Sequence, residues 1–158
     1  MTYLRGVSAV AAAAVLVLAV AACGGYGGGD DDESEGGSTT IGGMTAQLHG
    51  TKDVSNESGK VEIELYDYYF EPTILKGKAG QKVELELKNE GSAAHTFTLA
   101  EQSVNKEIQP GDETETEVTF PQSGQLKFVC TFHQSQGMIG ALQTSPGSSS
   151  PSTTTSKY

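Results

Sequence analysis

The sequence predicts an all-β fold, an antiparallel Greek-key β-sandwich or barrel of about seven to eight strands. Short segments alternate between apolar and polar residues, as in Val61-Glu62-Ile63-Glu64-Leu65. Turn-forming Gly, Pro and Asn residues separate these segments. No stretch shows a sustained helical period, so helices contribute little to the expected fold.

The expected strands follow one another through residues 60–144, which we take as the folded domain. Segment 61–68 alternates with period two, which marks a half-buried strand. Segment 81–88 alternates in the same way after a turn at 76–80, and 95–99 follows a turn at 89–92. Further strands are expected at 113–120, 125–130 and 138–143, with a short strand or irregular piece at 103–108.

The N-terminal residues 1–22 are typical of a secretion signal. Arg5 gives a positive start, and an apolar run rich in Ala and Val follows it and ends in Val20-Ala21-Ala22. The run is short for a membrane span. Val20-Ala21-Ala22-Cys23 resembles a bacterial lipobox, which implies cleavage before Cys23 and lipid attachment to its thiol. The alternative is an ordinary signal peptide followed by an incidental cysteine.

Residues 23–59 have the composition of a flexible linker. Glycine dominates 24–29, acidic residues dominate 30–35, and Gly, Ser and Thr follow. Such a chain behaves as an extended coil, so we expect a tether between a lipid anchor and the domain. Residues 46–48 are a weak candidate for an edge strand, and His49 is expected to be exposed to solvent. The tail 145–158 is rich in Ser, Thr and Pro and is expected to be disordered.

The charge of the chain excludes one class of partner. The 158 residues carry a formal net charge of −10, and Lys and Arg are spread thinly. Nucleic-acid binding would need a basic patch or stripe, and the sequence has none. An acidic surface favours either a basic partner, through electrostatic steering, or simple solubility.

The two cysteines of the chain have different expected roles. If Cys23 is lipidated, Cys130 is the one thiol of the mature protein and faces an oxidising compartment. A bound metal would occupy that thiol, because a coordinating thiol is deprotonated. A Cys23–Cys130 disulfide or an inert buried Cys130 are the alternatives, and neither accounts for the neighbouring His133 and Met138.

Segment 128–138 contains a thiolate, an imidazole and a thioether in the spacing Cys130-x2-His133-x4-Met138. Two His and one Cys with a weak, long Met ligand describe a blue-copper electron-transfer site. The second His is expected to be His95, which the alternation of 95–99 places on the inward face. Structural zinc is a minor alternative, because it needs four strong ligands and a thioether is a poor one. A second loop cysteine, a His-x-His pair or a hydrolytic triad is also missing, so we expect no enzyme activity.

Residues 60–144 resemble a type 1 blue copper domain of the cupredoxin family, and the ligand loop is most similar to that of plastocyanin. The resemblance includes Gln134 after His133, Gly137 before Met138 and the turn Asn89-x-Gly91. It implies one copper ion held strongly by His95, Cys130 and His133 and weakly by Met138. It also implies that the ring edge of His133, near the surface, is the port for electrons.

Two positions depart from the family pattern. Thr96 stands where plastocyanin-like chains often have Asn, and its hydroxyl is expected to bond toward Thr131 in the same supporting role. Phe132 stands where Pro is common. It is expected either to enlarge an apolar docking patch around His133 or to pack inward.

The function expected from the sequence is that of a membrane-tethered, monomeric carrier of single electrons outside the cytoplasmic membrane. Its expected partners are redox proteins such as a cytochrome or a terminal oxidase or reductase. The alternative is a copper-binding protein for storage, delivery or resistance, and a binding module with a vestigial site is a third possibility. The absence of Met- or His-rich tracts favours the carrier.

Overall fold

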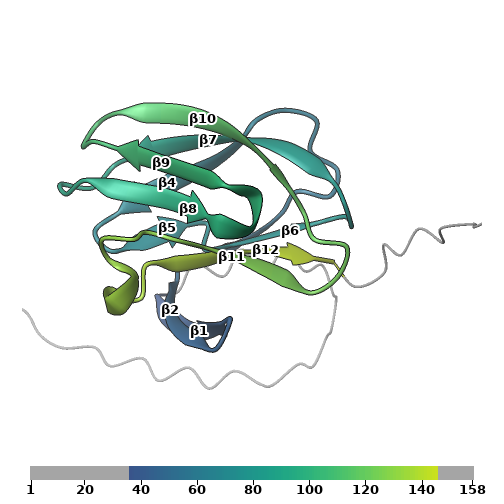
Figure 1. Cartoon of the computed structure of the whole chain (residues 1–158), viewed down its shortest axis with the longest axis horizontal. Helices are drawn as coiled ribbons and strands as arrows, with labels where there is room; N and C mark the ends of the chain where they lie inside the picture. The colour runs from purple at the N-terminus through teal and green to yellow at the C-terminus, as the bar shows by residue number, and fades with distance from the viewer. Residues whose placement is uncertain (1–35, 146–158) are drawn as a thin grey trace, which may run out of the picture. The chain divides into compact units, whose positions relative to one another are not determined.

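Two β-sheets pack face to face and enclose the hydrophobic core (Figure 1). The computed structural model describes residues 36–145, which belong to one compact unit. The predicted signal 1–22, Cys23, the acidic run 30–35 and the tail from residue 146 lie outside the described residues. Within the described part of the chain, no helix is long and apolar enough to cross a membrane.

The first sheet has four strands in the order β10–β7–β4–β5, and the second has six in the order β3–β6–β12–β11–β8–β9. The first contains β4 (Val61–Tyr66), β5 (Tyr69–Glu71), β7 (Lys82–Asn89) and β10 (Glu113–Thr119). The second contains β3 (Thr51–Asp53), β6 (Ile74–Gly77), β8 (His95–Leu99), β9 (Val104–Ile108), β11 (Gln125–Val129) and β12 (Ile139–Thr144).

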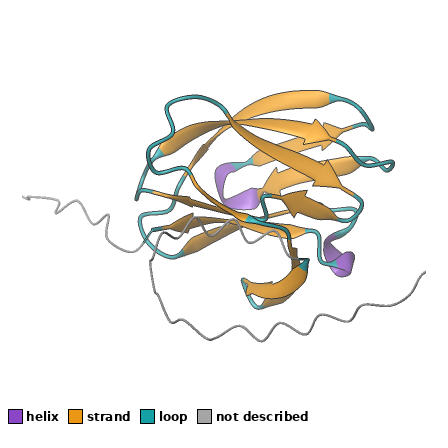
Figure 2. Ribbon diagram, turned by 180° about the vertical axis from the view of Figure 1, so that it is seen from behind, coloured by secondary structure: helices purple, strands orange, loops and turns teal. Residues whose placement is uncertain are grey.

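Four smaller elements complete the described chain. Strands β1 (Gly37–Ile41) and β2 (Met44–Leu48) pair with each other in a two-stranded ribbon. Two 3-10 helices, η1 (Ala100–Gln102) and η2 (Gln134–Gln136), are the short helical turns of Figure 2.

The predicted alternation places apolar side chains between the two sheets. In β4, Val61, Ile63 and Leu65 are buried, while Glu62 between them is exposed. Strand β7 alternates in the same way. Each inward-facing side chain packs against the opposite sheet and is removed from water. Full burial of a Val, Leu or Ile side chain contributes about 1.5–3 kcal/mol. The predicted all-β sandwich is therefore confirmed.

Both sheets are mixed, whereas the sequence predicted antiparallel pairing. Strand β4 pairs with β7 in parallel, and β6 pairs in parallel with both β12 and β3. Side chains alternate across a strand with period two in either kind of pairing. The hydrophobic pattern therefore cannot distinguish parallel from antiparallel neighbours.

A cluster of aromatic rings fills the core beneath the end of β11. The ring centroid of Phe128 lies 5.0 Å from that of Phe70 and 4.7 Å from that of Phe97. Phe128 stands opposite Gly140 in the β11–β12 register. A Cβ at position 140 would overlap the Phe128 ring, so glycine is needed for this packing. The cluster supports Cys130, which follows β11 two residues after Phe128.

The folded domain begins well before Lys60, so the predicted linker boundary at residue 59 is wrong. Strands β1 to β3 all lie within the predicted linker 23–59. Ile41 and Ala46 of the ribbon are buried against Val129 and Ile139 of the six-stranded sheet. The weak edge strand expected at 46–48 is confirmed as part of β2.

The error has a physical reason. Gly, Ser and Thr dominate β1, so its composition resembles that of a coil. The buried side chain of Ile41 and pairing with β2 nevertheless hold β1 in the fold. Strand β3 extends the six-stranded sheet, and Val54 directly after it is fully buried in the main core.

A chain that begins at Lys60 should be much less stable than one that begins at Gly36. The shorter chain loses Ile41 and Val54, and burial of these two side chains contributes at least about 3 kcal/mol. Urea unfolding of the two metal-free proteins measures the difference. Equal free energies of unfolding would contradict the assignment of β1 to β3 to the domain.

Candidate metal centre

The loop between β11 and β12 carries three of the predicted ligands. The backbone N–H of Cys130 donates to the carbonyl of Met138 at 3.1 Å and closes the loop. Inside it, the N–H of His133 donates to Cys130 O at 3.1 Å, and the N–H of Met138 donates to His133 O at 3.3 Å. These bonds hold the three residues at set positions on a nine-residue loop (residues 130–138).

His95 joins these residues from the first position of β8. Its Nδ1 lies 3.1 Å from His133 Nδ1 and 3.8 Å from Cys130 Sγ, and His133 Nδ1 lies 3.5 Å from that sulfur. The three donor atoms lie within 4.8 Å of one another. The structure therefore brings together the two imidazoles and the thiol that the sequence singled out.

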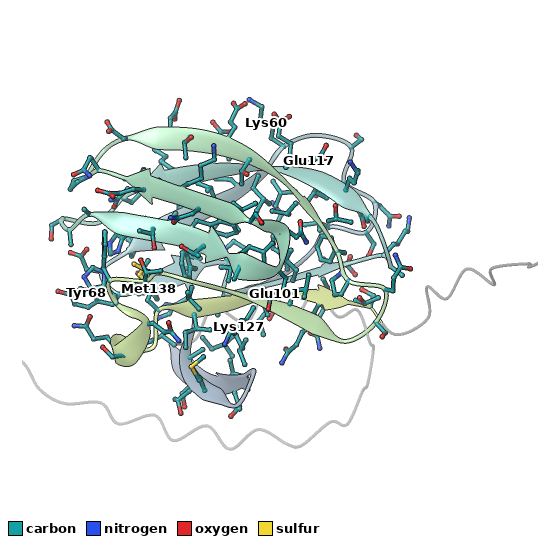
Figure 3. The ribbon with its side chains drawn as sticks, in the orientation of Figure 1. Lys60, Tyr68, Glu101, Glu117, Lys127 and Met138 are labelled. Atoms are coloured by element: carbon teal, nitrogen blue, oxygen red, sulfur yellow. The ribbon has the colours of Figure 1, made fainter. Side chains whose placement is uncertain are left out.

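Met138 is fully buried and directly precedes β12. In Figure 3 it is labelled at the same end of the sandwich as Tyr68, away from Lys60 and Glu117. The fourth predicted residue thus lies at the closing end of the ligand loop. Burial keeps its thioether out of water and within the apolar core.

Thr96 and Thr131 connect the ligand loop to β8, as the sequence predicted. The Thr96 hydroxyl accepts the N–H of Thr131 at 2.8 Å, and the two hydroxyl oxygens lie 3.0 Å apart. The backbone N–H of Thr96 donates to Cys130 Sγ at 3.3 Å. A hydrogen bond within a protein contributes about 0.5–1.5 kcal/mol, so these contacts help to hold the ligand loop against β8.

Asp67 belongs to the site and was not predicted. It lies in the turn between β4 and β5, and its Oδ1 is 3.0 Å from His95 Nε2. The carboxylate also accepts the Ser92 hydroxyl and the N–H groups of Ser92 and Ala93, the latter two at 3.0 and 3.1 Å. These hydrogen bonds, led by that of the Ser92 side chain, hold the pKa of Asp67 far below its ordinary value.

Burial lowers the pKa of His95 and outweighs the nearby Asp67 carboxylate, which acts in the opposite direction. The imidazole therefore favours its neutral form, which is the form that binds a metal. Its hydrogen bond to Asp67 assigns the proton to Nε2 and leaves Nδ1 to face Cys130 and His133.

Two aromatic side chains border the partly exposed ring of His133. The ring centroid of Tyr68 lies 4.5 Å from that of His133, and the centroid of Phe132 lies 6.3 Å from it. Tyr68 is 37% exposed and Phe132 is 52% exposed, and these two are the exposed large hydrophobic residues of the described chain. Phe132 thus points outward and does not pack into the core.

The ribbon also contacts the ligand loop. The N–H of Gln47 donates to Gly137 O at 3.0 Å, and its side-chain amide donates to Gln136 O at 3.3 Å. Gly137 adopts a φ of 90°, a conformation that favours glycine. His49, at the end of the ribbon, stacks on Tyr69 with a centroid distance of 3.5 Å and takes no part in the ligand group.

A model of the cupredoxin-like domain family matches residues 39–141. The chain belongs to the cupredoxin-like family. The match begins inside β1, in agreement with a domain that includes the ribbon. The copper-resistant cuproprotein CopI of Pseudomonas aeruginosa is 40% identical to this chain over 52 residues, which are 33% of this chain and 29% of that protein.

Solved structures with low sequence identity resemble the chain. The metal-binding domain of the Cu(I)-exporting P-type ATPase CopA of Streptococcus pneumoniae is 16% identical, with a TM-score of 0.49 over 60% of this chain and 95% of that one. Auracyanin from Roseiflexus castenholzii is 19% identical, with a TM-score of 0.47 over 56% of this chain and 98% of that one.

The donor set fits the copper that a cupredoxin fold implies. Two imidazole nitrogens and one thiol sulfur lie within 4.8 Å of one another, and Met138, buried at the end of the ligand loop, carries a soft thioether. Soft sulfur ligands together with imidazoles select copper. His95, Cys130 and His133 would hold the ion, and Met138 would add the weak ligand.

Addition of Cu(II) to the purified protein should produce an intense visible band from thiolate-to-copper charge transfer. The band should be absent from Cys130→Ser, because that variant lacks the thiolate, and it should survive in the control His49→Ala. Visible spectroscopy during a copper titration measures both. A colourless wild-type protein that binds only zinc would contradict the copper assignment.

Proposed function

We propose that the protein carries single electrons between redox proteins, through one type 1 copper ion bound by His95, Cys130, His133 and Met138. One observation carries the proposal. Three of these residues are fully buried, and only the ring of His133 approaches the surface, between Tyr68 and Phe132. The arrangement therefore offers an outside partner one short route to an enclosed centre.

Rigid ligands suit this task. Bound copper supplies a centre that alternates between two oxidation states. The closed loop, the bonds of Thr96 and the contacts of Gln47 each restrict movement of the ligand side chains. Because the residues hold their positions, little rearrangement accompanies the gain or loss of an electron.

The apolar border of His133 suits transient docking. Tyr68 and Phe132 present apolar area around the imidazole, and a partner that covers them removes water from the transfer path. The surface pair is small, which is appropriate for the short-lived contacts of redox proteins. We infer that the partner is a cytochrome or a terminal oxidase or reductase.

Acidic residues on the outer face of the four-stranded sheet favour a partner with a basic surface. Glu62, Glu86 and Glu115 lie side by side in the registers of β4, β7 and β10. Glu115 forms an ion pair with Lys60, and Glu117, two residues further along β10, forms one with Lys82. The remaining negative charge would steer a basic protein toward this molecule at low ionic strength.

We propose that the mature chain is a monomer held outside the cytoplasmic membrane by lipid on Cys23. The lipobox-like residues 20–23 support this proposal, and the chain between them and β1 would serve as a tether. Multiple acyl chains anchor stably, since each buried methylene contributes about 0.8 kcal/mol. Mass spectrometry of the mature N-terminus decides: an unmodified, water-soluble N-terminus would exclude the anchor.

Copper storage, delivery or resistance is the second candidate. The local similarity to a protein named for copper resistance favours it. The same four residues would serve, but the protein would then release copper to an acceptor. Full burial of Cys130, His95 and Met138 disfavours rapid release.

Electron exchange with cytochromes or oxidases of the same membrane should be fast in the wild-type protein and about tenfold or more slower in Phe132→Ala. The variant loses apolar contact area next to His133, whereas the matched variant Phe132→Leu keeps most of it. Stopped-flow spectroscopy measures the rate. Slow exchange in the wild type, together with copper transfer to an acceptor, would favour copper handling, and unchanged exchange in Phe132→Ala would remove Phe132 from the docking surface.

A further inference from the structure

The hydrogen bond between Asp67 and His95 crosses from one sheet to the other. Asp67 follows the last residue of β4 in the four-stranded sheet, and His95 opens β8 in the six-stranded sheet. Oδ1 of Asp67 lies 3.0 Å from Nε2 of His95, on the side of the ring opposite to the donor atom Nδ1. The carboxylate thus contacts a buried ligand residue and, with 27% of its side chain exposed, still reaches the protein surface.

The turn 89–93 holds the carboxylate in place. Asn89 is buried, and its side-chain amide donates to the carbonyls of Ala93 and Ile108, at 2.9 Å each. Its Oδ1 accepts the N–H of Gly91 at 2.9 Å. Because these hydrogen bonds fix the turn 89–93, the N–H groups of Ser92 and Ala93 point at the Asp67 carboxylate and donate to it.

Gly91 leaves room for this contact. A Cβ at position 91 would lie 2.5 Å from Asp67 Oδ1 and 2.9 Å from His95 Nε2. Both distances are shorter than ordinary contacts of a methyl group. The turn is therefore built so that the carboxylate and the imidazole meet. The N–H of Ala93 donates to the same Oδ1 that contacts His95, and the N–H of Ser92 donates to Oδ2.

We propose that Asp67 is a positioning residue that sets the tautomer and the electron-donating strength of His95 and thereby favours the oxidised form of the bound metal. The proposal rests on copper binding by His95. A carboxylate that accepts the second N–H of a metal-bound imidazole fixes the ring and raises its basicity. Its negative charge also stabilises the more positive Cu(II) over Cu(I), because the charges attract.

Asp67→Asn tests the proposal with little change of shape. The Asn carbonyl oxygen still accepts from Ser92 and Ala93, but the negative charge is gone. The control is Asp53→Asn, because Asp53 also accepts a backbone N–H, that of Ser55 at 2.8 Å, and it belongs to β3 outside the ligand group. Both variants replace one charged carboxylate with one neutral amide of the same shape.

Spectroelectrochemistry of the copper-loaded proteins measures the ratio of Cu(II) to Cu(I) at a fixed potential. Asp67→Asn should lower that ratio at least tenfold, which for one electron is a rise of about 59 mV in the midpoint potential. The visible band should remain, and Asp53→Asn should match the wild type. A midpoint potential in Asp67→Asn equal to that of Asp53→Asn would overturn the proposal.

A second measurement needs neither copper nor a stable variant. In nitrogen-15 NMR of the metal-free wild-type protein, His95 should carry its proton on Nε2, protected from exchange by Asp67. A proton on Nδ1, or an even mixture of tautomers, would overturn the role of Asp67 even if copper binds. Failure of the copper proposal is seen separately, as a wild-type protein without the visible band.

Discussion

The hydrogen bond from Cys130 N–H to Met138 O is the interaction on which the site depends, because it closes the ligand loop at the ends of β11 and β12. Next to this bond, the β11–β12 register places Phe128 opposite Gly140, so the Phe128 ring can pack into the core. The loop therefore stands on a rigid base. Cys130 and Met138 are the first and last residues of the loop, and His133 lies between them in the sequence.

Contacts from three other parts of the fold complete the site. Strand β8 supplies His95 and the supporting Thr96, the β4–β5 turn supplies Asp67, and the ribbon contacts the loop through Gln47. These contacts come from both sheets and from the N-terminal strands. Assembly of the metal centre is thus coupled to folding of the whole domain, and bound metal would in turn stabilise the native state. The partly exposed ring of His133 is left at the surface, as the proposed carrier role requires.

The sequence predicted the parts that local pattern encodes. Period-two alternation indicated the strands, and the spacing of Cys130, His133 and Met138 indicated the loop. Asp67 could not be found in this way, because it meets His95 across 28 positions through the shape of a turn at 89–93. The ribbon was missed because the composition of β1 is that of a coil, and its burial comes from distant strands. Parallel pairing leaves the same alternation as antiparallel pairing.

We propose that His95, Cys130, His133 and Met138 form one rigid copper site whose ligands stay in place when the ion changes oxidation state. X-ray absorption spectroscopy of the copper-loaded protein tests this directly in the Cu(II) and Cu(I) forms. We expect one short copper–sulfur and two copper–nitrogen distances in both forms, with nearly unchanged lengths. A spectrum without a short copper–sulfur distance, or a change in the number of ligands between the two forms, would contradict it.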